Sequence, residues 1–191
     1  KTGIPTAIFE DPFPITQPGV VGTSQPNRPE GGPMAMFGGG GPPKPKGDIS
    51  KLWKLLGVEM DGDKIVWQEF NPEPKLGDIF PEWIFIDESL GDGTFQPFAA
   101  DDDISAGMKQ LLFFWAGSFR PASNSKLDFK KLAVTGRETG TVSYAATEAS
   151  MQTRNMMALP REMTRDAYII AAHLKGKVAP DAGLYLKDTT K

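Results

Sequence analysis

The sequence predicts an α/β domain with a β-rich second half. Three observations lead to this fold class: a short apolar strand near the start of the chain, an amphipathic helix at residues 49–56, and a series of apolar or alternating runs of strand length after it. A chain of 191 residues can bury one sizeable core, so we expect a single domain over residues 1–191.

The first predicted strand covers residues 6–10 (TAIFE) and runs into a Pro-rich turn at residues 11–14. Because it is largely apolar, it is typical of a strand that is buried on both faces of a sheet. The helix at residues 49–56 is predicted because its apolar residues recur at the i, i+3, i+4, i+7 spacing. Asp48 can cap its start and Gly57 can end it.

The next predicted elements are strands separated by turn-forming residues. The Asp61-Gly62 pair suits a tight turn into a strand at residues 64–68. A Pro-rich link at residues 72–81 leads to a further strand at residues 83–87 (WIFID). The order of elements in the first half is therefore strand, helix, strand, strand.

One short helix and three strands are predicted in the second half. The helix covers residues 104–110, behind Asp103 as its cap, and is followed by an apolar strand at residues 111–115. Residues 126–134 alternate with a one-residue slip, which indicates a bulged strand, and residues 167–174 are predicted as the last central strand. Residues 143–157 fit either a helix or a long loop.

Residues 18–47 differ in composition from the rest of the chain. They include nine glycines and seven prolines, and such a segment buries too little apolar surface to offset the entropy cost of ordering it. We therefore predict a flexible insertion. Its Gly38–Gly41 run near Lys44 lacks the G-x-x-x-x-G-K-[ST] pattern of a phosphate-binding loop, so a linker is the better interpretation.

Composition excludes several classes of function. A formal net charge of −3 gives no basic field for nucleic acid, and the absence of cysteine excludes disulfides, thiolate metal sites and cysteine nucleophiles. No run of 18 apolar residues is present, so we expect any membrane attachment to lie in segments outside this chain. No cofactor is predicted.

The acidic triplet Asp101, Asp102 and Asp103 is the candidate metal site. Carboxylates on adjacent loop residues can converge on a hard cation such as calcium. Helix capping and solvation explain these residues more simply, so no metal is predicted. The Asp-Gly-Asp sequence at residues 61–63 lacks the glycine and glutamate that a calcium-binding loop needs further on, and a hairpin turn is the better interpretation.

His173 is the only histidine, and a structural or edge role in a strand is its simpler interpretation. A hydrolase would have to use His173 as its base, but no G-x-S-x-G turn supplies a serine nucleophile. Two pairs of nearby carboxylates, Asp87 with Glu88 and Glu59 with Asp61, are interpreted as solvated surface. We therefore predict no catalytic residue.

Five segments, in this order, carry a family resemblance: TAIFEDPFP at 6–14, SKLWKLLGVEMDGDKIVW at 50–67, DDDISAGMKQLLFFWAGSF at 101–119, SKLDFKKLAVTGRETG at 125–140 and DAYIIAAHLKGKV at 166–178. The matched positions are Asp11, Pro12, Phe13, Asp102, Ile104, Ser105, Gly107, Leu111, Phe113, Gly117, Leu132, Thr135, Ala171, Ala172 and Gly176. In this pattern the chain resembles the auxiliary (GldG-like) proteins of gliding-motility-associated ABC transporters, also called the ABC-type uncharacterised transport system family. The insertion at residues 18–47 departs from the pattern.

The resemblance implies an open, mostly parallel sheet of the flavodoxin or glutamine-amidotransferase-like type, incomplete in this fragment. It also implies a domain on the extracytoplasmic (periplasmic) face of a bacterial cytoplasmic membrane, in a membrane-anchored protein that works beside an ABC permease and ATPase. A glutaminase activity is excluded because the chain has no cysteine nucleophile.

We therefore expect a non-catalytic auxiliary domain that acts through protein or envelope-substrate interaction. One alternative is a carbohydrate-binding or glycan-binding module, which would expose a row of aromatic residues chosen from Trp53, Trp67, Trp83 and Trp115. The aromatic segment at residues 111–117 (LLFFWAG) favours a buried strand over such a platform. The other alternative is a hydrolase that uses His173.

Overall fold

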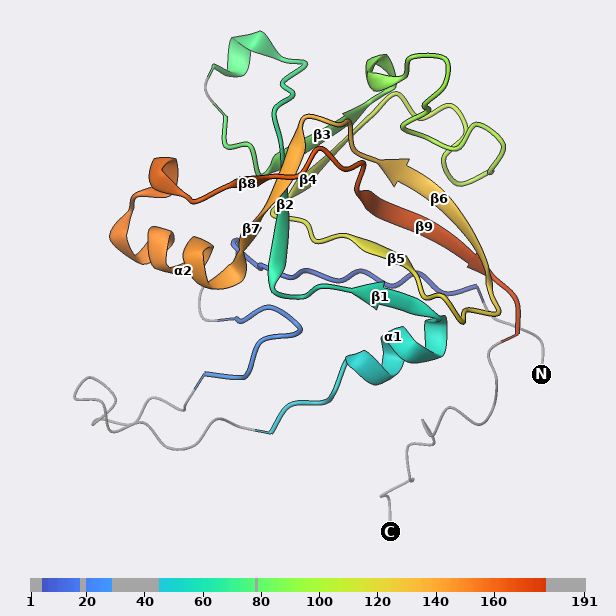
Figure 1. The fold of residues 1–191 in the computed structure, drawn as a ribbon, viewed down its shortest axis with the longest axis horizontal. Helices are drawn as coiled ribbons and strands as arrows, with labels where there is room; N and C mark the ends of the chain where they lie inside the picture. The colour runs from blue at the N-terminus through green and yellow to red at the C-terminus, as the bar shows by residue number, and fades with distance from the viewer. Residues whose placement is uncertain (1–4, 18–19, 29–44, 78, 178–191) are drawn as a thin grey trace.

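The computed structural model describes residues 5–17, 20–28, 45–77 and 79–177, which form several small sheets with two α-helices beside them (Figure 1). The helices are α1 (Ser50–Leu56) and α2 (Tyr144–Thr153), with short 3-10 helices η2 (Pro74–Leu76), η3 (Glu88–Leu90) and η4 (Met156–Ala158). The strands are β1 (Val58–Met60), β2 (Lys64–Gln68), β3 (Trp83–Asp87), β4 (Gln110–Phe114), β5 (Phe119–Pro121), β6 (Asp128–Val134), β7 (Thr139–Ser143), β8 (Glu162–Met163) and β9 (Ile169–Lys175). No helix in these ranges is long and apolar enough to cross a bilayer.

All strand pairs among the described residues are antiparallel. Strand β7 lies between β2 and β8, and the other strands form the pairs β1–β5, β3–β4 and β6–β9. The prediction of an open, mostly parallel sheet of the flavodoxin or glutamine-amidotransferase-like type is therefore wrong. Parallel strands need a long crossover connection, usually a helix. Neither helix supplies one, because α1 precedes the first strand and α2 connects β7 to its antiparallel partner β8.

Residues 6–10, predicted as a buried strand, form no strand in the structure. Ile8 is 46% exposed and Phe9 is 95% exposed. The chain enters the core at Pro12 and Phe13, and the Phe13 ring meets that of Tyr144 edge to face at 5.2 Å. The apolar composition of this segment indicated burial, but composition alone does not provide a neighbouring strand with which to pair.

The helix predicted at residues 49–56 is confirmed as α1. Its start and its end are determined by residues next to it in the sequence. Asp48 Oδ1 accepts a hydrogen bond from Ser50 N at 3.0 Å, which satisfies one N–H at the start of the helix. Gly57 adopts a left-handed φ of 63° and bonds its N–H back to the last turn. The strands predicted at residues 64–68 and 83–87 are confirmed as β2 and β3.

Strand β2 is buried on both faces and lies between two apolar clusters. Its side chains alternate, so the fully buried Ile65 and Val66 point into different clusters. The first cluster combines Ile65 with Phe13, Trp115, Val142, Tyr144 and Leu159. The second combines Val66 with Ile84, Ile86, Phe98 and Ala133. Strand β2 therefore contributes to both parts of the core.

The strand predicted at residues 111–115 is present as β4, but only one of its faces is buried. Leu111 and Phe113 pack against the second cluster. Leu112 is 37% exposed and Phe114 is 46% exposed on the other face. Trp115 follows the strand with φ of 48° and belongs to the first cluster. The aromatic run therefore supplies core contacts from one face and not from both.

Residues 104–110, predicted as a helix, form successive turns and then enter β4. Asp102, and not the predicted Asp103, accepts the hydrogen bond from Ile104 N, at 3.1 Å. Ser105 Oγ donates to Ala99 O at 2.9 Å, which ties the turns to the preceding chain. Such side-chain hydrogen bonds to the backbone compete with helix formation.

The structure also settles the remaining elements of the second half. The segment at residues 143–157 contains helix α2, for which Ser143 Oγ accepts a hydrogen bond from Ala146 N at 3.2 Å. The bulged strand is confirmed as β6, whose register with β9 shifts on both sides of Ala133. The last strand is present as β9, but among the described residues it pairs only with β6, so it is not central.

The predicted flexible insertion at residues 18–47 lies partly outside the described residues, including its Gly38–Gly41 run and Lys44. Its described ends contact the rest of the domain. Gln25 Nε2 donates to Asp63 Oδ1 at 2.7 Å, and Arg28 pairs with Glu148 at 2.8 Å. Lys46 Nζ donates to the Gly22 and Gln25 carbonyls, so the two described ends also bond to each other.

Candidate functional site

The only histidine of the chain lies beside one aspartate of the acidic triplet. His173 Nδ1, on β9, is 2.9 Å from Asp102 Oδ2. An ionised carboxylate can only accept, so Nδ1 carries the proton and Nε2 remains the acceptor of the neutral ring. The Asp102 side chain is 3% exposed and that of His173 is 28% exposed. The hydrogen bond from His173 is the largest cause that lowers the pKa of Asp102 below its usual value.

A second charged pair lies next to the first. Lys130 on β6 is the cross-strand partner of His173, and its Nζ is 2.9 Å from Asp101 Oδ2 and 2.8 Å from Asp101 O. This hydrogen bond raises the pKa of Lys130 and lowers that of Asp101. The two strands thus supply the donors, and two adjacent aspartates of one loop supply the acceptors.

These two pairs attach the loop at residues 99–107 to the β6–β9 sheet. A hydrolase would also need a nucleophile that gives its proton to His173. The serine nearest to Asp102 in sequence, Ser105, is 1% exposed and donates its Oγ–H to Ala99 O. No hydroxyl group in the described residues forms a hydrogen bond with His173. The arrangement is that of a structural link between loop and sheet.

The acidic triplet does not converge on one point. Asp101 and Asp102 each bond to a different basic side chain, while Asp103 is exposed. Across the described ranges no three histidine, aspartate or glutamate side chains are placed so that they could hold a metal ion. A hard cation would compete with Lys130 and His173 for the same oxygens.

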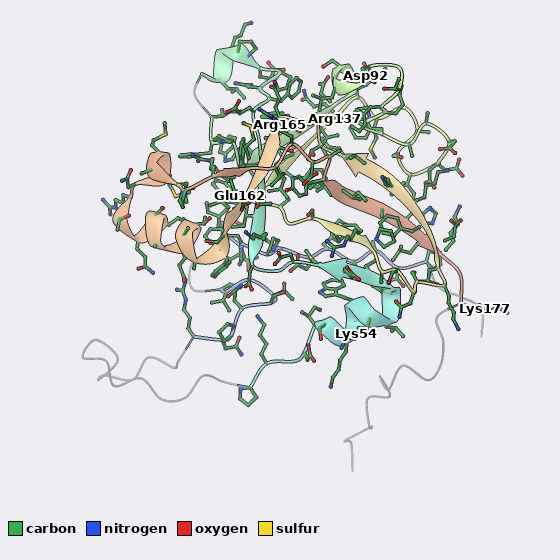
Figure 2. The ribbon with its side chains drawn as sticks, viewed as in Figure 1. Lys54, Asp92, Arg137, Glu162, Arg165 and Lys177 are labelled. Atoms are coloured by element: carbon green, nitrogen blue, oxygen red, sulfur yellow. The ribbon has the colours of Figure 1, made fainter. Side chains whose placement is uncertain are left out.

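An open depression of about 520 Å³ adjoins the charged pairs. The loop at residues 94–101 forms one side of it, and Lys131, Val134, Arg137 and Ala167 form the other. Phe95 and Phe98 contribute apolar surface, and Asp101 is shared with the Lys130 pair. Figure 2 shows Arg137 close to Asp92, on the side of the molecule away from Lys54.

The bulge in β6 shapes this depression. Val134 N donates to Pro97 O at 2.9 Å, and Phe98 pairs with Ala133, so residues 97–99 run along the edge of β6 that β9 leaves open. In a regular strand, residues three apart point to opposite faces. The register shifts around Ala133 allow Lys131 and Val134 to line the same depression.

The other carboxylates that the sequence singled out lie on the surface in separate pairs. Asp87 accepts a hydrogen bond from Gln110 Nε2 at 2.9 Å, while Glu88 pairs with Lys109. Glu59 pairs with Arg120 at 2.7 Å. Exposed pairs of this kind contribute little to stability and do not form a site for acid and base catalysis.

The four tryptophans do not form an exposed row. Trp67 is 3% exposed and Trp115 is 4% exposed, while Trp53 and Trp83 are half-buried. Trp83 packs edge to face on Phe114 at 4.9 Å, and Phe114 is the more exposed ring of the two. A stacking platform for sugars made from these tryptophans is therefore absent.

Two buried charged groups had no sequence signal. Glu82 is fully buried, and Arg161 donates to both of its oxygens, at 2.8 and 3.1 Å. The two residues are 79 positions apart, so only the fold brings them together. Glu10 is the second group: both of its carboxylate oxygens are shielded from solvent, and neither accepts a hydrogen bond at normal geometry.

Comparison with known proteins gives one match. No individual curated protein and no solved structure matches the chain. The model of the family described as ABC-type uncharacterized transport system matches residues 15–184, which is most of the sequence and includes the loop, both strands of the charged pairs and the open depression. The chain therefore belongs to the ABC-type uncharacterized transport system family and is an auxiliary component of such a system.

Proposed function

We propose that this chain is a non-catalytic, extracytoplasmic auxiliary domain of a GldG-like, gliding-motility-type ABC transport system. It acts by contact with the permease and ATPase subunits or with an envelope substrate, on the periplasmic side of the membrane. Family membership supports the transport role. The resemblance of the segments at 6–14, 50–67, 101–119, 125–140 and 166–178 to GldG-like proteins supports the finer assignment.

The observation that supports a non-catalytic role is the use of His173. Its Nδ1 is bonded to a buried aspartate, and the nearby Ser105 hydroxyl is directed to a backbone carbonyl. A general base needs a hydroxyl group within hydrogen-bond reach, and no hydroxyl of the described residues bonds to His173. The pair therefore holds the 99–107 loop in place.

Co-purification from membranes tests the proposed function. The full-length protein would be expressed at its native level with an affinity tag and extracted in mild detergent. We expect the permease and ATPase of the same system to be recovered with it in fixed ratio. Added protease should cleave the domain in spheroplasts whose inner membrane is intact. Recovery without either subunit, or protection from the protease, would contradict the proposal.

A separate assay tests the hydrolase alternative. The purified protein and His173→Gln would be compared on activated ester and peptide substrates. We expect both to show the same background rate. A rate in the unaltered protein that is at least 100-fold above that of the variant, in the usual range for one general base, would identify His173 as catalytic.

A further inference from the structure

The open depression combines an apolar floor with two cations that the His173–Asp102 pair does not involve. Phe98 and Val134 are 7% and 6% exposed and form part of its floor. Lys131 and Arg137 are exposed residues that line it. Within the described parts of the chain, neither of these cations forms an ion pair. Their charges are therefore available to a bound group.

The acidic residues near the depression are already engaged. Asp101 bonds to Lys130, as described above. Asp92 Oδ1 accepts hydrogen bonds from the Thr94 hydroxyl and from the Thr94 and Phe95 N–H groups. The Thr94 hydrogen bond is the largest cause that lowers the pKa of Asp92, and the charge of Arg137 adds to it. Arg137 thus lies near a carboxylate without direct pairing.

We propose that this depression binds an acidic peptide segment of a partner protein. Carboxylates of the peptide pair with Lys131 and Arg137, and an apolar side chain of the peptide covers Phe98 and Val134. The inference rests on the proposed function, because it names the kind of partner surface that the domain contacts.

The open shape of the depression favours a peptide over a small molecule. A volume of about 520 Å³ accommodates a few side chains. Sites for small molecules usually enclose most of the ligand surface, whereas this depression is open along one side. An occupant that is only partly covered, and that extends beyond the depression, fits this shape.

Charge favours an acidic occupant at this place in particular. The chain as a whole carries a formal net charge of −3, so an acidic peptide gains nothing from the overall field. Attraction must come from the local cations Lys131 and Arg137, at distances shorter than the screening length of about 8 Å in physiological salt. Binding should therefore depend on these two residues and weaken as salt is raised.

The test is an NMR titration of the protein with defined probes. The first probe is an amide-capped peptide of alternating glutamate and phenylalanine, the second replaces glutamate with lysine, and the third is phenylacetate. The protein variants are Lys131→Glu, Arg137→Glu and the control Lys54→Glu, which makes the same charge change on an exposed residue of α1 that forms no ion pair with any described residue. Figure 2 shows Lys54 far from Arg137.

We expect the acidic peptide to shift amide signals at residues 94–101 and 131–137. Its affinity should fall about tenfold in Lys131→Glu and in Arg137→Glu and remain unchanged in Lys54→Glu, as one direct charge pair implies. Unchanged spectra at millimolar peptide, equal binding of the lysine peptide, or an equal loss in Lys54→Glu would overturn the inference. Binding of phenylacetate as tight as that of the peptide would overturn the peptide as occupant.

Failure here is distinguishable from failure of the proposed function. The titration uses the purified domain and synthetic peptides, whereas co-purification tests association with transporter subunits. Subunits that co-purify equally well with Lys131→Glu and Arg137→Glu would leave the transport role intact and would remove this depression as the contact.

Discussion

Burial disfavours the charged form of the Glu10 carboxyl more strongly than the nearby Thr23 side chain and the charge of Lys46 favour it. Neither carboxylate oxygen contacts solvent, and burial is the largest cause that raises the pKa of this group. In the unfolded chain a glutamate ionises near about pH 4.3. As pH rises from there through the higher pKa of the folded state, the unfolded state loses its proton first, so folding stability falls.

We therefore expect Glu10→Gln to stabilise the protein at neutral pH, by about 1 kcal/mol, since it removes a charge but leaves a polar group to be buried. At pH 4 the carboxyl is mostly protonated in both states, so most of the difference should vanish. Urea denaturation of both proteins at pH 4 and pH 7 measures the change. A variant that is less stable at pH 7 would show that Glu10 has a favourable partner.

Asp102 should have the opposite pH dependence. Its pKa is lowered in the folded state, chiefly by the hydrogen bond from His173. The stability it contributes is present above the unfolded value of about pH 3.9 and is lost as pH falls through the lower folded pKa. Asp102→Asn should therefore unfold at a lower temperature at pH 7 and lose less stability on acidification. Asp103→Asn is the matched control, and equal melting temperatures for the two variants would argue against the link.

Sequence reasoning identified both members of this pair but not their association. The sequence places Asp102 in an acidic triplet and His173 in a separate strand, with no feature that links the two. They are 71 positions apart. Their contact depends on the register in which β9 pairs with β6 and on the turns of the 99–107 loop. Neither the strand register nor the path of this loop can be predicted from a local sequence pattern.

Helix α2 ends at a residue that is strained in its position. Arg154 closes the helix with φ of 55°, and its N–H bonds to the Met151 and Ser150 carbonyls. Glycine adopts this left-handed conformation without the clash of a Cβ atom. We expect Arg154→Gly to stabilise the protein by about 0.5 to 1 kcal/mol in chemical denaturation.

A glycine two positions earlier should have the reverse effect. Gln152 lies inside α2 and is exposed, so Gln152→Gly should cost about 1 kcal/mol through helix propensity alone. If both glycine variants were destabilised equally, strain at the helix end would be disproved.

The Glu82–Arg161 pair connects the start of β3 to the segment that leads into β8. The Glu82 carboxylate is fully buried and accepts two hydrogen bonds from Arg161, whose side chain is 18% exposed. Removal of Arg161 leaves a buried charge without a partner. We expect Arg161→Ala to cost about 3 to 5 kcal/mol in urea denaturation.

The exposed Glu59–Arg120 pair provides the control. Arg120→Ala should lower the free energy of unfolding by less than about 1 kcal/mol, since the side chains of Glu59 and Arg120 are both well solvated. Similar losses for Arg161→Ala and Arg120→Ala would mean that the Glu82 carboxylate gains access to water when its partner is removed.

The elements that were predicted correctly are determined by residues that are close together in the sequence. Asp48 accepts a hydrogen bond from Ser50 N at the start of α1 and Gly57 ends the helix, while β2 and β3 are short apolar runs between turn residues. The helix expected at residues 104–110 failed because Asp102 and Ser105 hydrogen-bond to other parts of the loop. The strand expected at residues 6–10 is not formed, since this segment takes part in none of the strand pairs of the described residues.

At the scale of the whole molecule, β2 makes the two apolar clusters depend on each other. Ile65 lies in one and Val66 in the other. We expect Ile65→Ala to cost about 2 to 5 kcal/mol, as for other large core residues. Tryptophan fluorescence reports the first cluster through Trp115, and amide exchange of Ile84 and Ile86 reports the second.

Both probes should show the same loss of stability, because one strand serves both clusters. A loss seen by fluorescence without faster exchange of Ile84 and Ile86 would indicate that the clusters unfold separately. Val66→Ala is the reciprocal variant in the second cluster, and both probes should again report the same loss of stability.

The arrangement of the strands could not be predicted from the sequence either, because it depends on contacts between distant segments. The family resemblance alone implied a parallel sheet, and parallel order requires specific non-local pairings. In the structure β2 pairs with β7 and β6 with β9, each across a long stretch of sequence. Strand composition indicates burial, but it does not identify the partner strand or its direction.

The wall of the open depression is held at both ends, by Val134 N with Pro97 O on one side and by the Asp101 and Asp102 pairs on the other. A surface fixed in this way is preorganised for binding. The motions of the loop are already restricted in the folded protein, so binding of a peptide does not have to restrict them further. Association should then be limited by encounter and not by rearrangement. Asp102→Asn, which removes one of the two pairs at that end, should weaken binding mainly through a less favourable entropy, visible in calorimetry.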